Sequence, residues 1–225
     1  MYKINLDRKW GVLDPEGEGY NPLTGREYEN IYLKDPEEKK KYSDYAKIIS
    51  SLPVYKFAKN IINEINKRQV ILVVAGTGSG KTVLVPKFAL HVVNYKEKVL
   101  VTIPQTSSVG NASEFAAKCH DVKLGTQVGY FHGQEKDKSK KGSILNYTST
   151  GSLAKILLNP RDPYLKRKGN DYKVIIIDEA HQRDLQMDQL LLLVKERLRN
   201  QLVISEQQNS NSYLRDWIKE EIKNG

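Results

Sequence analysis

Apolar and polar positions alternate along most of the chain in blocks that predict strands and helices in turn. From residue 69 onward, short runs rich in Val, Ile and Leu are separated by longer stretches with helical spacing of apolar residues. The short runs predict strands at 70–74, 98–103, 127–132, 143–148 and 173–177. The longer stretches predict helices at about 81–93, 109–118, 152–158 and 184–200. This alternation predicts a three-layer α/β domain, with a mostly parallel sheet covered by helices on both faces.

The chain divides into three parts by pattern. Residues 1–34 carry scattered glycines among polar residues and predict an irregular arm, with turn chemistry at 21–25. Residues 35–68 predict a helical extension that leads into the core, and residues 69–225 form the predicted α/β domain. In the second helix of the extension, the expected apolar face consists of Phe57, Ile61, Ile62 and Ile65.

A glycine-rich segment lies between the strand predicted at 70–74 and the helix that follows. It consists of Ala75, Gly76, Thr77, Gly78, Ser79, Gly80, Lys81 and Thr82. Glycines let a backbone wrap around phosphate oxygens with its N–H groups pointing inward, and the next helix N-terminus adds positive potential. Lys81 would bind the β- and γ-phosphates of ATP, and the Thr82 hydroxyl would ligate Mg²⁺. The strand before, the helix after and the Gly-Lys-Thr ending favour the loop of a P-loop NTPase over a chance turn, although Ala75 replaces the usual first glycine.

Acidic residues follow directly after the isoleucine-rich strand at 173–177. They are Asp178 and Glu179, followed by Ala180 and His181. In an open α/β sheet, ligands bind beyond the carboxyl ends of the strands, so these residues are expected on the same rim as the glycine-rich segment. Asp178 is suited to hold Mg²⁺, and Glu179 to orient and polarise an attacking water. Two carboxylates after a strand can also simply cap the next helix, but the upstream phosphate loop favours the catalytic interpretation.

Composition adds two constraints. The formal charge of +9 favours an anionic partner, for which nucleic acid is the commonest choice, although an ordinary lysine-rich surface explains it equally well. The single cysteine, Cys119, excludes an internal disulfide and a zinc site built on thiolates, and it fits a reducing compartment. The chain starts without a secretory signal, and its apolar runs are too short to span a bilayer. We therefore expect a soluble, intracellular protein of the cytoplasm or nucleus, without a membrane partner.

Two segments together resemble the motifs of a known family. The run from Asp178 to His181, followed by Gln182-Arg183-Asp184, resembles motif II of the DEAH-box helicases of superfamily 2, and residues 76–82 resemble their motif I. Residues 52–55 (Leu-Pro-Val-Tyr) and 128–130 (Val-Gly-Tyr) are also similar to the family. The resemblance covers about 52–200 and implies the first, RecA-like lobe of an enzyme that hydrolyses ATP with Mg²⁺ while moving along single-stranded nucleic acid, RNA rather than DNA. It also implies that His181 links the nucleotide site to a second lobe.

The same resemblance implies contacts with a nucleic-acid backbone. They would come from Pro104, Gln105 and Thr106, where motif Ia begins, and from Ser149, Thr150 and Gly151, where motif Ib lies. Many relatives carry two arginines after the proline, and their replacement by Gln105-Thr106 removes two phosphate-pairing charges. Phe115 stands where relatives place an arginine on adenine, and it either stacks there or packs in the core. The lysines at 136, 138, 140 and 141 either meet a phosphate backbone or form a solvated loop.

Elements that the family places after motif II are not found. Leu202-Val203-Ile204-Ser205 is the only apolar candidate for the strand before motif III, and no arginine-finger sequence from a second lobe is present. We therefore expect a lobe that stops before motif III, binds ATP and unwinds poorly by itself. Two alternatives stay open at this stage: a different P-loop ATPase motor subunit, and an inert nucleic-acid-binding module with a relic nucleotide site.

Overall fold

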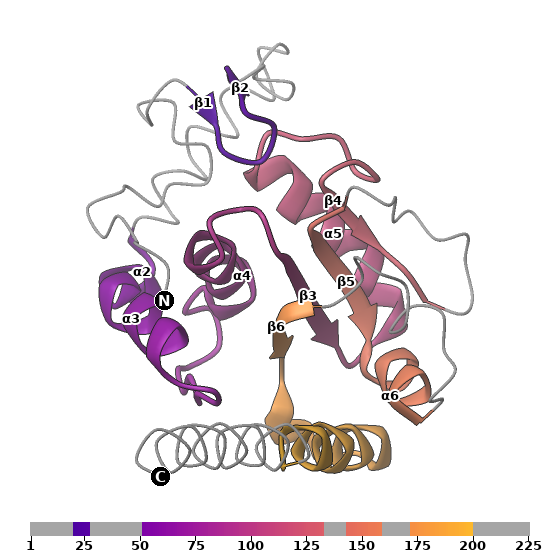
Figure 1. Cartoon of the computed structure of the whole chain (residues 1–225). Coiled ribbons are helices and arrows are strands. Elements are labelled where there is room, and N and C mark those ends of the chain that lie inside the picture. The colour runs from indigo at the N-terminus through magenta and orange to yellow at the C-terminus, as the bar shows by residue number, and fades with distance from the viewer. Residues whose placement is uncertain (1–19, 28–50, 133–142, 159–171, 200–225) are drawn as a thin grey trace, which may run out of the picture.

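The sheet at the centre of the molecule is parallel throughout. The computed structural model describes residues 20–27, 51–132, 143–158 and 172–199. Within these ranges, four strands pair in the order β4-β5-β3-β6, with all three pairings parallel (Figure 1). The strands are β3 (Lys98–Ile103), β4 (Val128–Tyr130), β5 (Leu145–Ser149) and β6 (Tyr172–Ile177). The predicted α/β class with a parallel sheet is confirmed.

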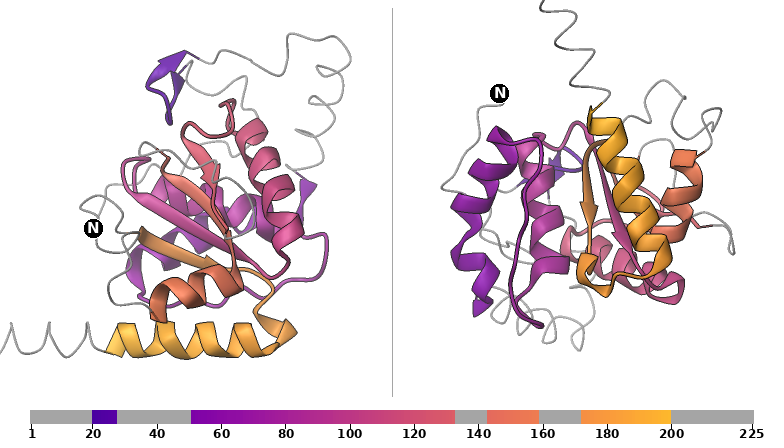
Figure 2. Two further views of the ribbon diagram at one scale, coloured as in Figure 1. Left: turned by 90° about the vertical axis from the view of Figure 1, so that its right-hand side faces the viewer. Right: turned by 90° about the horizontal axis from the view of Figure 1, so that it is seen from below.

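Helices cover both faces of this sheet, as Figure 2 shows. One face packs against α4 (Lys81–Val92) and α5 (Thr106–Cys119), and the other against α6 (Thr150–Leu158) and the helical residues 185–199. The central strand shows why both faces can be covered. In β3, Val99, Val101 and Ile103 belong to the core under α4 and α5, whereas Leu100 belongs to the core under α6. Successive side chains of a strand point to opposite faces, so a continuous apolar run builds two cores.

One predicted strand is wrong as a sheet element. Residues 70–74 pair with no described strand, and Val70, Leu72 and Val74 are 66%, 82% and 82% exposed. Val73 packs against the core beside α4, so only one side of the segment is covered. The neighbouring β6 is also less buried than expected, with Ile175 39% exposed. An apolar run reports hydrophobicity, but a buried parallel strand also needs a pairing edge and a covering helix, and the pattern specifies neither.

The helical extension packs against α4 rather than standing apart. Its described part consists of α2 (Pro53–Lys56) and α3 (Ala58–Lys67). Ile62 is fully buried in a cluster that includes Leu84 and Phe88 of α4, and the predicted positions Ile61 and Ile65 are partly buried against the same cluster. Phe57 does not belong to this face, because it is 58% exposed at the junction between α2 and α3. The change of helix axis at this junction breaks the periodicity on which that prediction rested.

Part of the N-terminal arm forms a hairpin on the back of the domain. Strands β1 (Tyr20–Asn21) and β2 (Arg26–Glu27) pair antiparallel around the turn that was predicted at 21–25. Asn21 is 2% exposed, and its side-chain amide donates a 2.8 Å hydrogen bond to the carbonyl of His120 at the C-terminal end of α5. This segment of the expected irregular arm is therefore ordered by contact with the core.

Several sequence-based expectations lie outside the described residues. They concern the rest of the arm, the basic loop at 136–141, and the chain from residue 200 onward, including 202–205. Among the residues that are described, no helix combines the length and apolarity required to span a bilayer.

The single thiol of the chain is deeply buried. Cys119 is 5% exposed, and burial raises its pKa from 9.0 to about 12, although Lys87 partly offsets the rise. Its contribution to stability is therefore complete below pH 9 and is lost between pH 9 and about 12, because the unfolded thiol ionises first. At about pH 8 we expect iodoacetamide to alkylate the folded chain at least about a hundredfold more slowly than the chain in guanidinium, since only the thiolate reacts. Equal rates in the two states would contradict this burial.

Candidate functional site

The glycine-rich loop, residues 75–80, joins the segment at 70–74 to α4. Gly78 and Gly80 adopt φ of +74° and +93°, which L side chains rarely adopt, and Gly80 is the N-cap of α4. Ser79 closes a turn by donating its N–H to the carbonyl of Gly76 over 3.3 Å. The loop thus turns sharply into the positive end of a 12-residue helix, which is the geometry that favours an anion.

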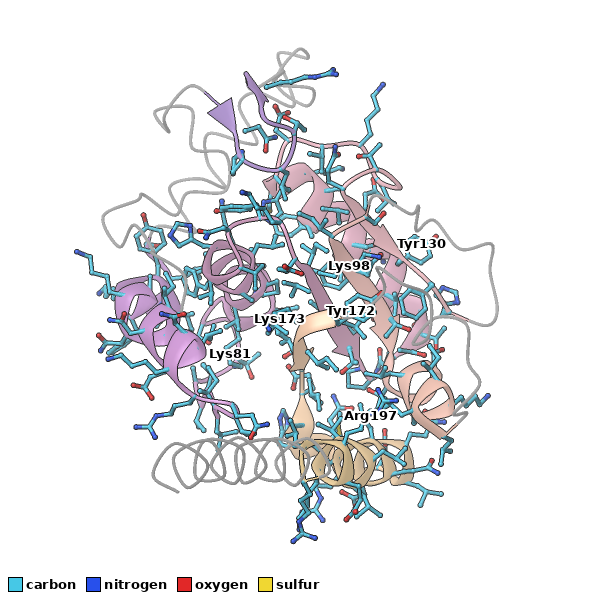
Figure 3. The ribbon with its side chains drawn as sticks, in the orientation of Figure 1. Lys81, Lys98, Tyr130, Tyr172, Lys173 and Arg197 are labelled. Atoms are coloured by element: carbon cyan, nitrogen blue, oxygen red, sulfur yellow. The ribbon has the colours of Figure 1, made fainter. Side chains whose placement is uncertain are left out.

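Lys81 lies over this loop rather than extending away from it (Figure 3). Its Nζ donates hydrogen bonds of 2.6 Å to the carbonyl of Ala75 and 2.9 Å to that of Gly76, and it lies 3.5 Å from the Ser79 hydroxyl. The ammonium is therefore held at the mouth of the loop by groups that a phosphate oxygen can replace.

The two candidate motifs meet at the carboxyl end of the sheet, as the rim argument predicted. The Thr82 hydroxyl donates a 2.7 Å hydrogen bond to Oδ2 of Asp178, across 96 residues of sequence. The other oxygen, Oδ1, accepts a 3.0 Å hydrogen bond from the backbone N–H of Glu179, and the Asp178 N–H donates to the Thr102 carbonyl of β3 over 3.1 Å. The carboxylate is thus held by the chain at both oxygens and by the sheet behind it.

The turn after Asp178 stores backbone strain. Glu179 and Arg183 adopt positive φ of 54° and 51°, which non-glycine residues rarely do, and they flank the short 3₁₀ turn η1 (Ala180–Gln182). Such strain persists where the surrounding structure imposes it and is concentrated at functional sites. Glu179 Oε2 lies 3.3 Å from Nε2 of His181, and both side chains reach solvent, at 38% and 79% exposure. The pair is therefore accessible to a ligand.

The end of this turn is fixed to the helix that follows it. The Asp184 carboxylate accepts a 2.7 Å hydrogen bond from the N–H of Met187, which caps the helical residues 185–199. Arg183 pairs with Asp188 at 2.6 Å, and this hydrogen bond and the carboxylate charge raise the pKa of its guanidinium. Met187 is fully buried, so the turn rests on a packed helix.

The two segments expected to touch nucleic acid lie side by side. Ile103 of β3 pairs with Ser149 of β5, so the chain following each strand emerges at the same rim as Asp178. Gln105 is exposed at the N-cap of α5. Their neighbours Pro104, Thr106 and Gly151 are partly exposed, at or next to the N-termini of α5 and α6.

Two residues of this predicted set point inward. Ser149 and Thr150 are 5% and 1% exposed, and the Ser149 hydroxyl accepts a hydrogen bond from the N–H of Ser152 over 3.3 Å. The Thr150 hydroxyl is buried without a hydrogen-bond partner. A ligand at this rim therefore meets the backbone of the 149–151 segment rather than these side chains.

Sequence reasoning missed three residues that touch the candidate site. Leu52 and Val54 contact the glycine-rich loop from outside, and Gln186 lies against Gly151, where an added Cβ would collide with its amide oxygen. The Leu-Pro pair was visible as part of the resemblance, but nothing in the pattern of Gln186 separates it from an ordinary exposed helical residue. Phe115 packs against the cluster beside α4, in agreement with its alternative as a core residue.

Comparison with known proteins identifies the lineage of this lobe. The family model described as "Type III restriction enzyme, res subunit" matches residues 38–205. The chain belongs to this family. Within it, the expected resemblance to the first lobe of a DEAH-box, superfamily 2 helicase is confirmed by the relatives that follow.

The relatives of this DEAH-box lobe are considerably longer than the chain. It is 34% identical over 198 residues to an ATP-dependent RNA helicase of Acanthamoeba polyphaga mimivirus, covering 88% of this chain and 26% of that protein. It is 36% identical over 159 residues to the pre-mRNA-splicing factor ATP-dependent RNA helicase DEAH10 of Arabidopsis thaliana, covering 68% and 21%. The crystal structure of the Escherichia coli DEAH/RHA helicase HrpB matches with a TM-score of 0.56 and 26% identity, over 65% of this chain and 18% of that one. The DEAH-box lobe therefore spans about a quarter of the curated relatives that it matches.

Proposed function

We propose that this DEAH-box lobe binds Mg²⁺-ATP and contributes the nucleotide-hydrolysing residues of a helicase that moves along single-stranded RNA. The observation that carries the proposal is the 2.7 Å hydrogen bond between Thr82 and Asp178, which joins the glycine-rich loop to the acidic turn. A chance glycine turn and an ordinary helix cap have no reason to meet in this way. The relatives named as ATP-dependent RNA helicases support both the nucleotide and the choice of RNA.

The oxygen atoms at the centre of the site fit a magnesium ion. Mg²⁺ prefers oxygen ligands and usually takes only one or two carboxylates from a protein, together with substrate phosphates and water. Thr82 and Asp178 provide a hydroxyl and a carboxylate in contact, and no cluster of three or more His, Cys, Asp or Glu side chains among the described residues offers a fuller protein cage. When bound, the ion would bridge the β- and γ-phosphates and neutralise their charge.

The remaining residues of the site would divide the work of hydrolysis. The backbone N–H groups of residues 75–80 would surround the phosphates, and Lys81 would exchange its loop carbonyls for β- and γ-phosphate oxygens. Glu179 would accept a proton from the attacking water, because its carboxylate is exposed beside the proposed metal ligand Asp178. His181, in contact with Glu179, would report the state of this carboxylate to a second lobe.

RNA would lie along the rim formed by the N-termini of α5 and α6. Backbone N–H groups at helix N-termini bind phosphates without regard to sequence, as a motor that moves along a strand requires. Because Gln105 replaces a charged residue found in relatives, we expect this rim to bind weakly in isolation. We also infer that strand separation needs the second lobe, and that the protein works inside the cell, where such RNA is found.

The proposed function is tested by competition against a fluorescent ATP analogue with Mg²⁺ on this chain. ATP is expected to compete about a hundredfold better than AMP, because the glycine-rich loop and Lys81 bind the β- and γ-phosphates that AMP lacks. Equal competition by ATP and AMP would contradict a phosphate-binding role for this loop. Absence of any binding by a chain that is folded by circular dichroism would contradict the proposed function itself.

The RNA rim makes its own prediction. Gln105→Glu is expected to weaken binding of a single-stranded oligouridine about threefold at low salt, because it places a negative charge where phosphates would lie. Asn94→Asp makes the same charge change in the turn at the opposite end of β3 and should leave binding unchanged. Fluorescence anisotropy measures both. An equal effect of the two substitutions would mean that net charge, and not this rim, attracts RNA.

A further inference from the structure

The glycine-rich loop is held from outside by the chain segment that opens α2. The N–H of Val54 donates a 3.2 Å hydrogen bond to the carbonyl of Ser79. Leu52 lies against Gly80 so closely that a Cβ on this glycine would be 2.7 Å from Leu52 Cδ1 and 3.2 Å from Leu52 Cβ. Two neighbouring residues of the loop are therefore in contact with two residues of one short segment.

This contact determines which way a loop amide points. Ser79 and Gly80 share one peptide group, and in a trans peptide the C=O and N–H point in opposite directions. Because the Ser79 carbonyl is directed to Val54 on α2, the Gly80 N–H is directed away from α2. An anion-binding loop depends on such N–H groups pointing inward, so the hydrogen bond from Val54 presets a phosphate donor.

The segment can exert this effect because it is itself firmly packed. Val54 is 3% exposed in the cluster that joins α2 and α3 to Leu84 and Phe88 of α4. Leu52 packs against the same cluster and has the extended backbone of an N-cap, followed by Pro53 at the first helical position. Its side chain fills the space left by the missing Cβ of Gly80, where the backbone φ of +93° already requires glycine.

We propose that Leu52 is a positioning residue for the nucleotide's phosphates, acting through the glycine-rich loop. It packs against Gly80 and keeps the Ser79–Gly80 peptide in the orientation that presents its N–H to the β- and γ-phosphates. The proposal rests on the proposed binding of ATP by this loop, and it adds a residue outside the two motifs to the determinants of nucleotide affinity.

The test uses the whole chain and a matched control within the same cluster. Leu52→Ala and Ile65→Ala both shorten a partly buried side chain that packs on the α2–α4 cluster, but only Leu52 contacts the loop. Leu52→Ala is expected to weaken binding of the fluorescent ATP analogue about tenfold and to reduce the preference for ATP over AMP, because a preset donor is lost. Ile65→Ala should lower the melting temperature without changing this preference, and Leu52→Met should keep affinity within about threefold of wild type, because it preserves the apolar contact.

Each outcome decides the matter at a temperature where circular dichroism shows all variants folded. Wild-type affinity and wild-type ATP preference in Leu52→Ala would overturn the inference, and so would an equal loss of preference in Ile65→Ala. A wild-type chain that binds no nucleotide would instead overturn the proposed function, and the inference with it. A selective loss in Leu52→Ala, recovered in Leu52→Met, is the expected result.

Discussion

Replacing Lys81 with alanine is expected to weaken binding of Mg²⁺-ATP by this chain at least about a hundredfold. The ammonium is held over the glycine-rich loop by the carbonyls of Ala75 and Gly76, so it is already positioned for phosphate oxygens. Two charge-assisted hydrogen bonds to phosphate, at about 1.5–3 kcal/mol each, account for a loss of this size. Titration with a fluorescent ATP analogue measures the effect.

A matched substitution separates the contact from the overall charge. Lys96→Ala removes one positive charge from the exposed turn beyond the far end of α4, and it should bind nucleotide as wild type does. If Lys81→Ala also binds as wild type does, the glycine-rich loop has no phosphate-binding role. The alternative of an inert module with a relic nucleotide site would then be favoured.

Replacing Glu179 with glutamine is expected to slow ATP hydrolysis about a thousandfold while nucleotide binding is retained. The substitution keeps the size of the side chain and removes the group that would accept a proton from water, a role that typically contributes 10²–10⁴ in rate. Because hydrolysis would need the second lobe, the measurement is single-turnover ATP cleavage by a version of the chain extended past Gly225 with that lobe. Titration of the same variant with the ATP analogue shows whether binding is kept.

The control for this variant is Glu196→Gln, which removes an exposed carboxylate on the helix after the acidic turn. It should hydrolyse ATP at the wild-type rate. Unimpaired hydrolysis by Glu179→Gln would remove Glu179 from the mechanism and leave Asp178 as the only carboxylate of the turn still assigned a role.

The sequence predicted the parts of this lobe that depend on chain connectivity. Parallel strands deliver their carboxyl ends to one rim, so a loop after one strand and an acidic turn after another were expected to meet, and Thr82 does contact Asp178. The same reasoning brought Ile103 and Ser149 to neighbouring positions. These predictions need only strand order and direction, which alternation of strand and helix supplies.

Features that depend on neighbours in space were not predictable in the same way. The apolar segment at 70–74 was expected to be a buried strand, but Leu72 and Val74 are largely exposed, because burial requires partners that an apolar run does not name. Ser149 and Thr150 were expected to face a ligand, yet they turn inward at the start of α6. The positive φ of Glu179 and the contact of Leu52 with Gly80 likewise arise from packing between segments.

The position of β3 has a mechanical consequence for any helicase built on this lobe. At Thr102 this strand is paired with Thr148 of β5 on one side and Ile177 of β6 on the other, so a single ladder joins the proposed RNA rim to the acidic turn. Close-packed, hydrogen-bonded layers resist internal sliding. A power stroke driven by ATP would therefore carry the lobe along RNA as one stiff body, and the compliant joints of such a motor would lie between lobes rather than within this one.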